Sequence, residues 1–191
     1  MDKIIQDIDN KAQKIQGWFG PNEVRLLYPI ISALPENALF VEIGTFHGRS
    51  TLCWRLINPK IRILTNDICS QDGIGTQENQ TKLGTIIPKQ IDEEVLKEGN
   101  IFQVRGSSHE VVKTFNWPID FLFIDSEHGY KDTIDTLNEW GKFVKPGHYI
   151  ACHDYDINGF PGVVTGIAEY LKQHPNVTLE KVESGVAILK V

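Results

Sequence analysis

Apolar positions along the chain change their period, and each change marks the boundary of a predicted element. Over residues 2–16 they recur at helical spacing and predict an amphipathic helix with one apolar stripe: Ile4, Ile5, Ile8, Ala12 and Ile15. The glycines within residues 17–20 interrupt this pattern, and Pro21 suits the first turn of a second helix that runs to about residue 34. The chain is therefore expected to begin with two helices before any strand.

From residue 39 onward, short apolar runs alternate with segments of helical period. The runs predict buried strands at residues 39–43, 61–65, 101–104, 119–124 and 149–152. Helices are predicted between and after them, at residues 49–56, about 88–98, 107–115, 131–144 and from 161 onward. Two final strands, 177–183 and 185–190, are joined through Ser184 and Gly185, which predicts a hairpin.

Some of these helices carry more specific expectations. Ser107 and Glu110 have the spacing of a capping box, in which each side chain bonds the backbone of the other residue. The helix at 131–144 is expected to bury the stripe Ile134, Leu137 and Val144. The helix that Pro161 begins is expected to bury the stripe Val164, Ile167, Ala168 and Leu171.

Strands that alternate with helices predict an α/β fold, with a parallel sheet covered by helices on both faces. No repeat or linker divides the sequence, so we expect one domain, residues 37–191, preceded by an N-terminal helical extension, residues 1–36. In such folds ligands bind beyond the carboxyl ends of the strands. The segments that follow the predicted strands are polar or rich in glycine: 44–50, Asp67, 106–107, 125–128 and 153–156.

Composition narrows the class of protein. The chain has 191 residues, of which 41% are hydrophobic and 23% charged, as is typical of a globular domain with its own core. The formal net charge is −6 and no cluster of Lys and Arg is present, which argues against binding to a nucleic-acid backbone. No apolar run approaches the roughly 20 residues of a membrane span, so we expect no membrane association.

Two features predict a cytoplasmic protein. The acidic N-terminus has no apolar stretch like that of a secretory signal and does not resemble a transit peptide. The three cysteines, Cys53, Cys69 and Cys152, are odd in number and widely spaced, which indicates reduced thiols and not a disulfide framework or a zinc site.

A glycine motif, Glu42-x-Gly44-x-x-x-Gly48, follows the first predicted strand and opens a helix. Glycines allow the backbone to approach a ligand closely, and a helix N-terminus presents free N–H groups. The same pair also occurs in a tight strand-to-helix turn without a ligand. The motif is not a phosphate-binding P-loop, because it has one residue too few between the glycines. It is not a dinucleotide-binding G-x-G-x-x-G motif either, because Phe46 stands where that motif has its second glycine.

Acidic and imidazole side chains follow three other strands. Asp67 stands about 20 residues after the glycine loop, where an acid can accept both hydroxyls of a ribose, although turns also favour Asp. Asp125 and Asp154 could converge on one divalent cation, or each could form only a local turn or cap. His128 lies within reach of the same place and could act as a general base, or could be structural.

Taken together, these motifs resemble those of a known family. The run VEIGTFHGRST, followed by TND, RGSS, FLFIDSEHGY and KPGHYIACHDY and a final hairpin, is similar to class I S-adenosylmethionine-dependent methyltransferases. It resembles more narrowly a compact subgroup that includes metal-dependent sugar O-methyltransferases. The resemblance covers about residues 17–190 and implies a Rossmann-like doubly wound sheet of seven strands, mostly parallel with the last strand antiparallel.

The resemblance also implies roles for individual residues. Glu42, Gly44 and Gly48 would hold the methionine end of S-adenosylmethionine, Asp67 its ribose, and Gly106 and Ser107 its adenine, with Thr45, Ser50 and Asp125 as further cofactor contacts. His128 matches a catalytic base, with His153 as the competing candidate. A divalent cation, Mg²⁺ or a softer ion, would bind to Asp125, His153 and Asp154. His153 departs from the family pattern, in which the residue before Asp154 is commonly acidic, and this admits a softer ion or an enzyme without metal.

Two other functions fit parts of the sequence. A nucleotide- or NAD-binding oxidoreductase could use a similar sheet, although the glycine spacing disfavours it, and a methyltransferase-like module could bind the cofactor without catalysis. The methyl acceptor, a small molecule, is expected to contact the N-terminal helices and the polar segment 69–100, and residues 69–90 are predicted to form a mobile lid. A homo-oligomer is compatible with the sequence, which carries no signal for or against it.

Overall fold

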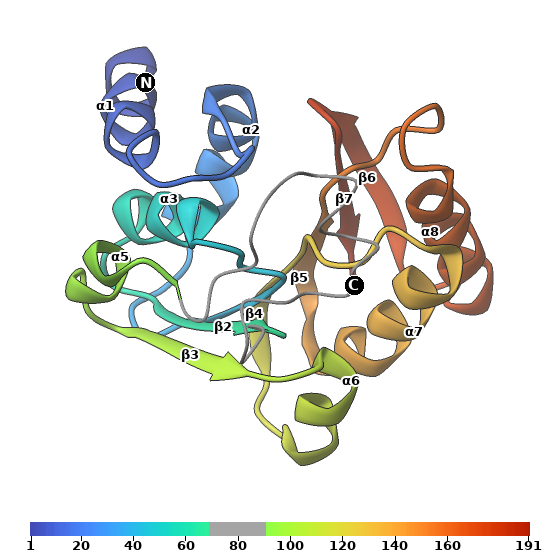
Figure 1. The fold of residues 1–191 in the computed structure, drawn as a ribbon. Coiled ribbons are helices and arrows are strands. Elements are labelled where there is room, and N and C mark those ends of the chain that lie inside the picture. The colour runs from blue at the N-terminus through green and yellow to red at the C-terminus, as the bar shows by residue number, and fades with distance from the viewer. Residues whose placement is uncertain (69–90) are drawn as a thin grey trace.

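The structure, a computed structural model of the chain, describes residues 1–68 and 91–191. Within these residues, seven strands form a single sheet in the order β3-β2-β1-β4-β5-β7-β6 (Figure 1). The strands are β1 Leu39–Ile43, β2 Arg62–Asp67, β3 Ile101–Arg105, β4 Ile119–Ile124, β5 Val144–Cys152, β6 Thr178–Glu183 and β7 Val186–Lys190. Neighbours from β3 through β5 pair in parallel, whereas β7 is antiparallel to both β5 and β6. The predicted fold class, with its antiparallel last strand, is confirmed.

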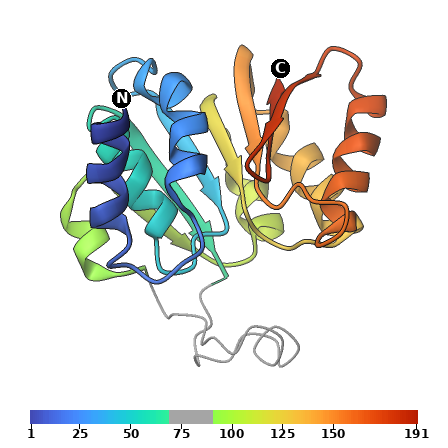
Figure 2. The same cartoon turned by 90° about the horizontal axis from the view of Figure 1, so that it is seen from above.

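Helices cover both faces of this sheet (Figures 1 and 2). One layer contains α1 Asp2–Ala12, α2 Pro21–Ser32, α3 Arg49–Ile57 and the short α5 Glu93–Lys97. The other layer contains α6 Ser108–Val111 with the adjoining 3-10 turn Val112–Thr114, α7 Tyr130–Gly141 and α8 Pro161–Gln173. In the described part of the chain, no helix is both long and apolar enough to pass through a membrane.

Alternate residues of each central strand supply the two cores. In β1, Phe40 packs among the residues of α1, α2 and α3, whereas Val41 packs among those of α7 and α8. This alternation follows from the two-residue period of a strand, and both faces are apolar because both are covered. The N-terminal extension shares the first core, since Ile5 and Leu27 pack in the same cluster as Phe40.

The predicted helices agree with the structure better in position than in detail. The segment after Ser107 forms a single α-turn followed by a 3-10 turn, and the Ser107 side chain makes no capping hydrogen bond, so the capping box is wrong. Val144 belongs to β5, where it pairs with Ile119, because α7 already ends at Gly141. The predicted lid, residues 69–90, lies outside the described residues. The first part of the predicted helix at 88–98 lies outside them as well.

The buried face of α8 is rotated from the predicted one. Ala168 is exposed, and the buried residues are Val163, Gly166, Ile167 and Tyr170. The reason is the close approach of α8 to α7, because a Cβ atom on Gly166 would lie 2.8 Å from the Cβ of Thr133. A glycine therefore determines which face of this helix is buried.

Two of the three cysteines lie in the described residues and both are free thiols. Cys53 and Cys152 are buried, and burial raises the pKa of Cys152 to about 12 and that of Cys53 well above its ordinary range. These thiols are therefore protonated near neutral pH, as expected of inert core cysteines. Cys69 lies outside the described residues.

Candidate functional site

The carboxyl ends of β1, β2, β4 and β5 bring the predicted site segments to one edge of the sheet. Backbone hydrogen bonds tie them together there, from Gly44 N to the Asn66 carbonyl at 2.9 Å, from Asp125 N to the Ile43 carbonyl at 2.8 Å, and from His153 N to the Ile124 carbonyl at 2.9 Å. The glycine loop, Asp67, Asp125 and His153 are thus neighbours in space, although they are spread over more than half of the sequence.

The glycine loop after β1 is held in a conformation that depends on Gly44. This residue has φ +86°, and a Cβ atom on it would lie 2.0 Å from the backbone oxygen of Asp125. Asp67 fixes the next part of the loop, because its Oδ2 accepts hydrogen bonds from the backbone N–H groups of Thr45 (2.8 Å) and Phe46 (2.7 Å). Gly48, at φ +89°, then caps the N-terminus of α3. Backbone conformation and hydrogen bonds to backbone N–H groups therefore fix the shape of this loop.

Glu42 lies beneath the loop and is fully buried. Its Oε1 accepts hydrogen bonds from Ser50 Oγ (2.7 Å) and Trp54 Nε1 (2.9 Å), and its Oε2 accepts them from Thr51 Oγ1 (2.5 Å) and Thr65 Oγ1 (2.9 Å). Burial raises the pKa of Glu42 to about 7, although these hydrogen bonds lower it. The carboxyl group therefore ties β1 to β2 and α3 and does not face an open surface.

Other predicted cofactor residues divide into supporting and surface positions. Thr45 is also buried, with its hydroxyl bonded to Thr65, and Ser50 is buried against Glu42, so the geometry favours a supporting role for both side chains. Gly106 and Ser107 follow β3 next to Asp67, whose carbonyl accepts a 2.9 Å hydrogen bond from Gly106 N. Both are partly exposed, and both lie at the same edge of the sheet.

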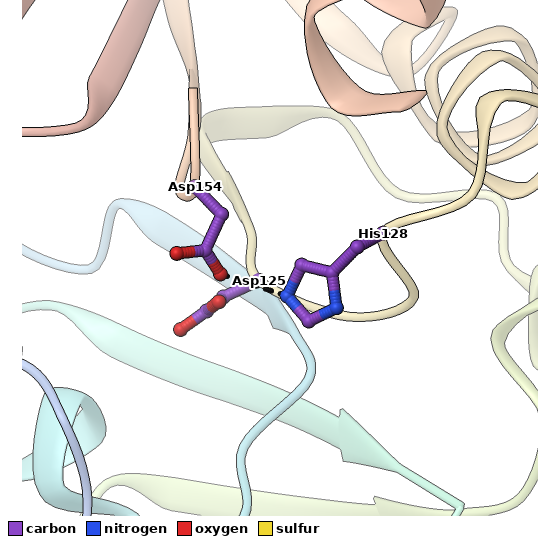
Figure 3. Close-up of side chains that lie close together, drawn as sticks. All are labelled: Asp125, His128 and Asp154. Atoms are coloured by element: carbon purple, nitrogen blue, oxygen red, sulfur yellow. Dashed lines mark hydrogen bonds and ion pairs between the residues drawn. The ribbon is translucent and has the colours of Figure 1, made fainter. Parts of the chain in front are cut away.

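Three ligand-type side chains point toward one another beyond β4 and β5 (Figure 3). Asp125 directly follows β4, His128 lies on the loop before α7, and Asp154 follows β5. The Nε2 atom of His128 lies 2.7 Å from Oδ2 of Asp154. Asp154 has φ +58°, in the left-handed region where most side chains are strained, and such strain is common at functional sites.

His153 lies behind these groups and contacts both carboxylates. Its Nδ1 atom is 3.3 Å from Oδ1 of Asp125 and 3.3 Å from Oδ1 of Asp154, and its side chain is 12% exposed. On its other side, Nε2 lies 4.0 Å from Oε1 of Glu23 in α2. Carboxyl groups therefore flank both nitrogens of this imidazole.

The charges of this cluster shift the pKa of each member. Burial lowers the pKa of His153, but the nearby carboxylates of Asp125 and Asp154 outweigh it and raise that pKa to about 10. Burial also lowers the pKa of His128, and Asp154 outweighs it, so the pKa lies above its ordinary value. The pKa of Asp154 is raised by burial and lowered more strongly by the two imidazoles, and it lies well below its usual range.

Comparison with known proteins decides the family. The sequence model of a family described as a methyltransferase domain matches residues 41–155, which run from within β1 to just beyond β5 and include the glycine loop, Asp67 and the cluster of Asp125, His128, His153 and Asp154. This chain belongs to that methyltransferase family.

A relative of this methyltransferase is the protein R132 of Acanthamoeba polyphaga mimivirus, 29% identical over 148 residues. The match covers 69% of this chain, and the chain spans only 58% of the length of that viral protein. R132 is described as uncharacterized, so it adds no activity to the comparison.

Several solved structures share the fold of this methyltransferase. The O-methyltransferase NovP has a TM-score of 0.68 at 16% identity, over 90% of this chain and 80% of NovP. An O-methyltransferase from Bacillus cereus in complex with SAH has a TM-score of 0.62 at 17% identity, over 100% of this chain and 92% of that one. The calicheamicin methyltransferase CalS11 has a TM-score of 0.63 at 16% identity, over 88% and 77%. At these identities the likeness concerns the fold alone.

The methyltransferase has a donor set that suits a divalent cation. In the described residues, one ligand atom from each of Asp125, His128 and Asp154 lies within 4.8 Å of the others. Two carboxylates with one imidazole fit Mg²⁺ or a softer ion such as Mn²⁺ or Zn²⁺. His128 thus lies with the two acids, and His153, the third ligand expected from the sequence, contacts the same two carboxylates from behind.

The site includes residues that sequence reasoning did not select. Phe19 packs its ring 5.9 Å from that of His153, and Glu23 approaches the same imidazole. Arg49 donates from Nη1 to the Gly17 carbonyl at 2.6 Å and so attaches the N-terminal segment to the start of α3. These contacts join residues far apart in the sequence, and no periodic pattern or motif marks them.

We expect the stability of this methyltransferase to fall as the pH rises above neutrality. The pKa of His153 is about 10 in the folded chain and about 6.5 when unfolded, so its ion pairs stabilise the fold fully below pH 6.5. This contribution is lost progressively as the pH rises to about 10, and it amounts to on the order of 5 kcal/mol. The shift of Asp154 reflects the same contacts and is not added.

Urea denaturation between pH 7 and 10, with a chelator present, measures this dependence. The His153→Gln variant should lose most of the slope because its side chain does not titrate. A wild-type unfolding free energy that stays level or rises across this range would contradict the ion-pair geometry.

Proposed function

We propose that this methyltransferase transfers the methyl group of S-adenosylmethionine to a hydroxyl oxygen of a small molecule or a sugar. The observation that carries the proposal is the hydrogen bond of 2.7 Å between His128 and Asp154, next to Asp125 and beside the glycine loop. An imidazole oriented by a carboxylate is a suitable acceptor for a hydroxyl proton. Solved structures of the same fold include proteins described as O-methyltransferases, one of them in complex with SAH.

The glycine loop and its neighbours fit the cofactor. The backbone at Gly44 and Gly48 allows the close approach that the methionine end needs, because neither residue has a side chain. Asp67 would bind the ribose hydroxyls, and Gly106 with Ser107 would bind the adenine. Glu42, Thr45 and Ser50 would support the loop from below. When bound, S-adenosylmethionine supplies an electrophilic methyl group and leaves as S-adenosylhomocysteine.

His128 would remove the proton of the acceptor hydroxyl through Nδ1, because Nε2 is the nitrogen bonded to Asp154. Asp154 orients the ring and stabilises the imidazolium that forms, and the ring of Phe160, 4.6 Å away, covers one face of the imidazole. His153 holds Asp125 and Asp154 in place from behind. Asp125 also borders the cofactor loop, since its backbone oxygen abuts Gly44.

A divalent cation is a second component of the proposal. Asp125 and Asp154 would hold it, with His128 as a third ligand where His128 does not act as the base. A bound cation lowers the pKa of a coordinated hydroxyl and would favour its deprotonation. Removal of metal by a chelator separates the two arrangements, because a metal-free enzyme with His128 as base would keep its activity.

The first test concerns cofactor binding. Replacing Asp67 with alanine should weaken S-adenosylmethionine binding by about 1.5–3 kcal/mol, the range for hydrogen bonds to a charged group. The variant loses both the ribose contact and the anchor of Thr45 and Phe46. Isothermal calorimetry gives the affinity directly.

The matched control is Asp135→Ala, which removes a partly exposed acid of α7 that forms an ion pair with a surface lysine, Lys131. It should leave the affinity unchanged. Wild-type protein that binds no S-adenosylmethionine would contradict the proposal. Tight binding of NAD instead would favour the oxidoreductase alternative. Cofactor binding without turnover of any hydroxylated compound would favour a non-catalytic module.

A further inference from the structure

Trp18 is an exposed aromatic residue held in a fixed place. Its side chain is 62% exposed, whereas Trp54 and Trp140 are fully buried. The residues on both sides of it are anchored, because the Gly17 carbonyl accepts the hydrogen bond from Arg49 and Phe19 is buried against Trp54 at 4.7 Å between ring centroids. Packing of the core therefore does not explain why a tryptophan stands at position 18, because its side chain is mostly exposed.

One face of the Trp18 indole packs on the cofactor loop. Its ring stacks on Phe46 with 5.3 Å between centroids and an interplanar angle of 29°. Phe46 has φ +52°, and its backbone N–H donates to Asp67, so the loop geometry determines where this ring lies. The remaining surface of the indole is open to solvent beside the proposed cofactor site.

The same segment also reaches the cluster of acids and imidazoles. Phe19 lies 5.9 Å from the His153 ring and 5.8 Å from that of Phe123 in β4, and Glu23 follows at the start of α2. Residues 17–23 thus extend from the glycine loop to the residues behind Asp125 and Asp154. The segment therefore borders both the glycine loop and the cluster of acids and imidazoles, beside which the acceptor would lie.

We infer that Trp18 determines acceptor specificity by stacking on a flat ring face of the hydroxylated acceptor. The inference rests on the proposed function and adds a class of substrate, a six-membered ring that bears the hydroxyl. Indole surfaces bind aromatic rings by offset stacking and also pack on the C–H face of a sugar ring. In this assignment the extension, residues 1–36, is part of the acceptor site.

Steady-state kinetics with S-adenosylmethionine and three acceptor probes test the inference. Catechol presents an aromatic ring, methyl glucopyranoside presents a sugar ring, and propylene glycol presents neighbouring hydroxyls without a ring. Trp18→Ala should raise KM for the preferred ring probe about tenfold, as expected for loss of one stacking contact, while kcat changes by less than about twofold. Trp18→Phe should restore most of the loss, and the ring probe that responds identifies the kind of ring.

Trp117→Ala is the matched control. Trp117 is 58% exposed and also packs on an aromatic ring, that of Phe115, but it precedes β4 and so lies at the opposite edge of the sheet. This variant should leave both constants unchanged. Calorimetry with S-adenosylmethionine should give the same affinity for wild type and for Trp18→Ala.

The outcomes separate this inference from the proposed function. If wild type methylates a ring probe and Trp18→Ala leaves its KM unchanged, the role of Trp18 is wrong and the proposed function stands. If Trp18→Ala weakens cofactor binding as much as it raises KM, Trp18 belongs to the cofactor site and the inference is also wrong. If wild type binds the cofactor but methylates neither ring probe, both the acceptor class and the inference fall.

Discussion

Replacing His128 with alanine is expected to lower the turnover of methyl transfer by about 10²–10⁴-fold, the usual loss on removal of a general base. An alcohol is almost wholly protonated near neutral pH, so it reacts slowly unless a nearby group takes its proton. His128 has the required geometry, since its Nε2 lies 2.7 Å from Asp154 in the cluster beside the cofactor loop. Cofactor affinity should remain unchanged, because His128 is not among the residues that we assign to cofactor binding.

The direction in which turnover changes with pH provides a second test of His128 as the base. A base must be neutral to accept a proton, and Asp154 raises the pKa of His128 above its ordinary value against the effect of burial. Turnover should therefore increase with pH through an inflection above pH 6.5, the ordinary value for histidine. The His128→Gln variant should lack this inflection.

Three further variants and a chelator complete this experiment. His109→Ala removes a histidine that is also paired with a carboxylate, Glu139 at 2.6 Å, but on the surface between α6 and α7, and it should retain full turnover. Asp154→Asn should weaken the dependence on added metal. If His128→Ala stays active while His153→Ala is inactive, the base is His153. If chelation leaves methylation unchanged, no metal is involved.

Replacing Gly44 with alanine should both destabilise the fold and abolish cofactor binding. The residue has φ +86°, where an L-residue is strained by about 1–2 kcal/mol, and the new Cβ would lie 2.0 Å from a backbone oxygen of Asp125. Relief requires the ends of β1 and β4 to separate, so we expect a loss of about 4 kcal/mol or more in the free energy of unfolding. Urea denaturation and calorimetry measure the two effects.

Gly99→Ala separates backbone strain from steric clash. Gly99 has φ +74°, and a Cβ atom on it would meet no described atom within 4 Å, so this variant should lose only about 1 kcal/mol and keep cofactor affinity. Equal losses in the two variants would show that the contact between Gly44 and Asp125 is not what constrains the loop.

The sheet could be predicted because buried parallel strands have a strong signal. Segments such as 119–124 are apolar at nearly every position, since both faces of the strand are covered. The polar residues that end these strands then fall at one edge by topology alone, so the position of the candidate site was also predictable. The face of α8 was not, because a single glycine, Gly166, sets how closely that helix approaches α7.

The inward orientation of Glu42 was predictable in principle. Glu42 stands two residues after Phe40 in β1, so its side chain points to the same face of the sheet, which α3 covers. A residue of the loop after β1 would not be constrained in this way. The position of His153 between the two acids depends on the register of β4 and β5, which pairs Ile124 with Cys152. Register between distant strands, and the course of residues 17–23 across the site, leave no periodic pattern in the sequence.

Transfer of an isotopically labelled methyl group tests the central claim most directly. Wild-type protein is incubated with labelled S-adenosylmethionine and hydroxylated ring compounds, and mass spectrometry follows both the acceptor and S-adenosylhomocysteine. The account predicts equal amounts of S-adenosylhomocysteine and of acceptor labelled on oxygen, with both lost in His128→Ala. Label on nitrogen or carbon, or no S-adenosylhomocysteine from protein that binds the cofactor, would contradict it.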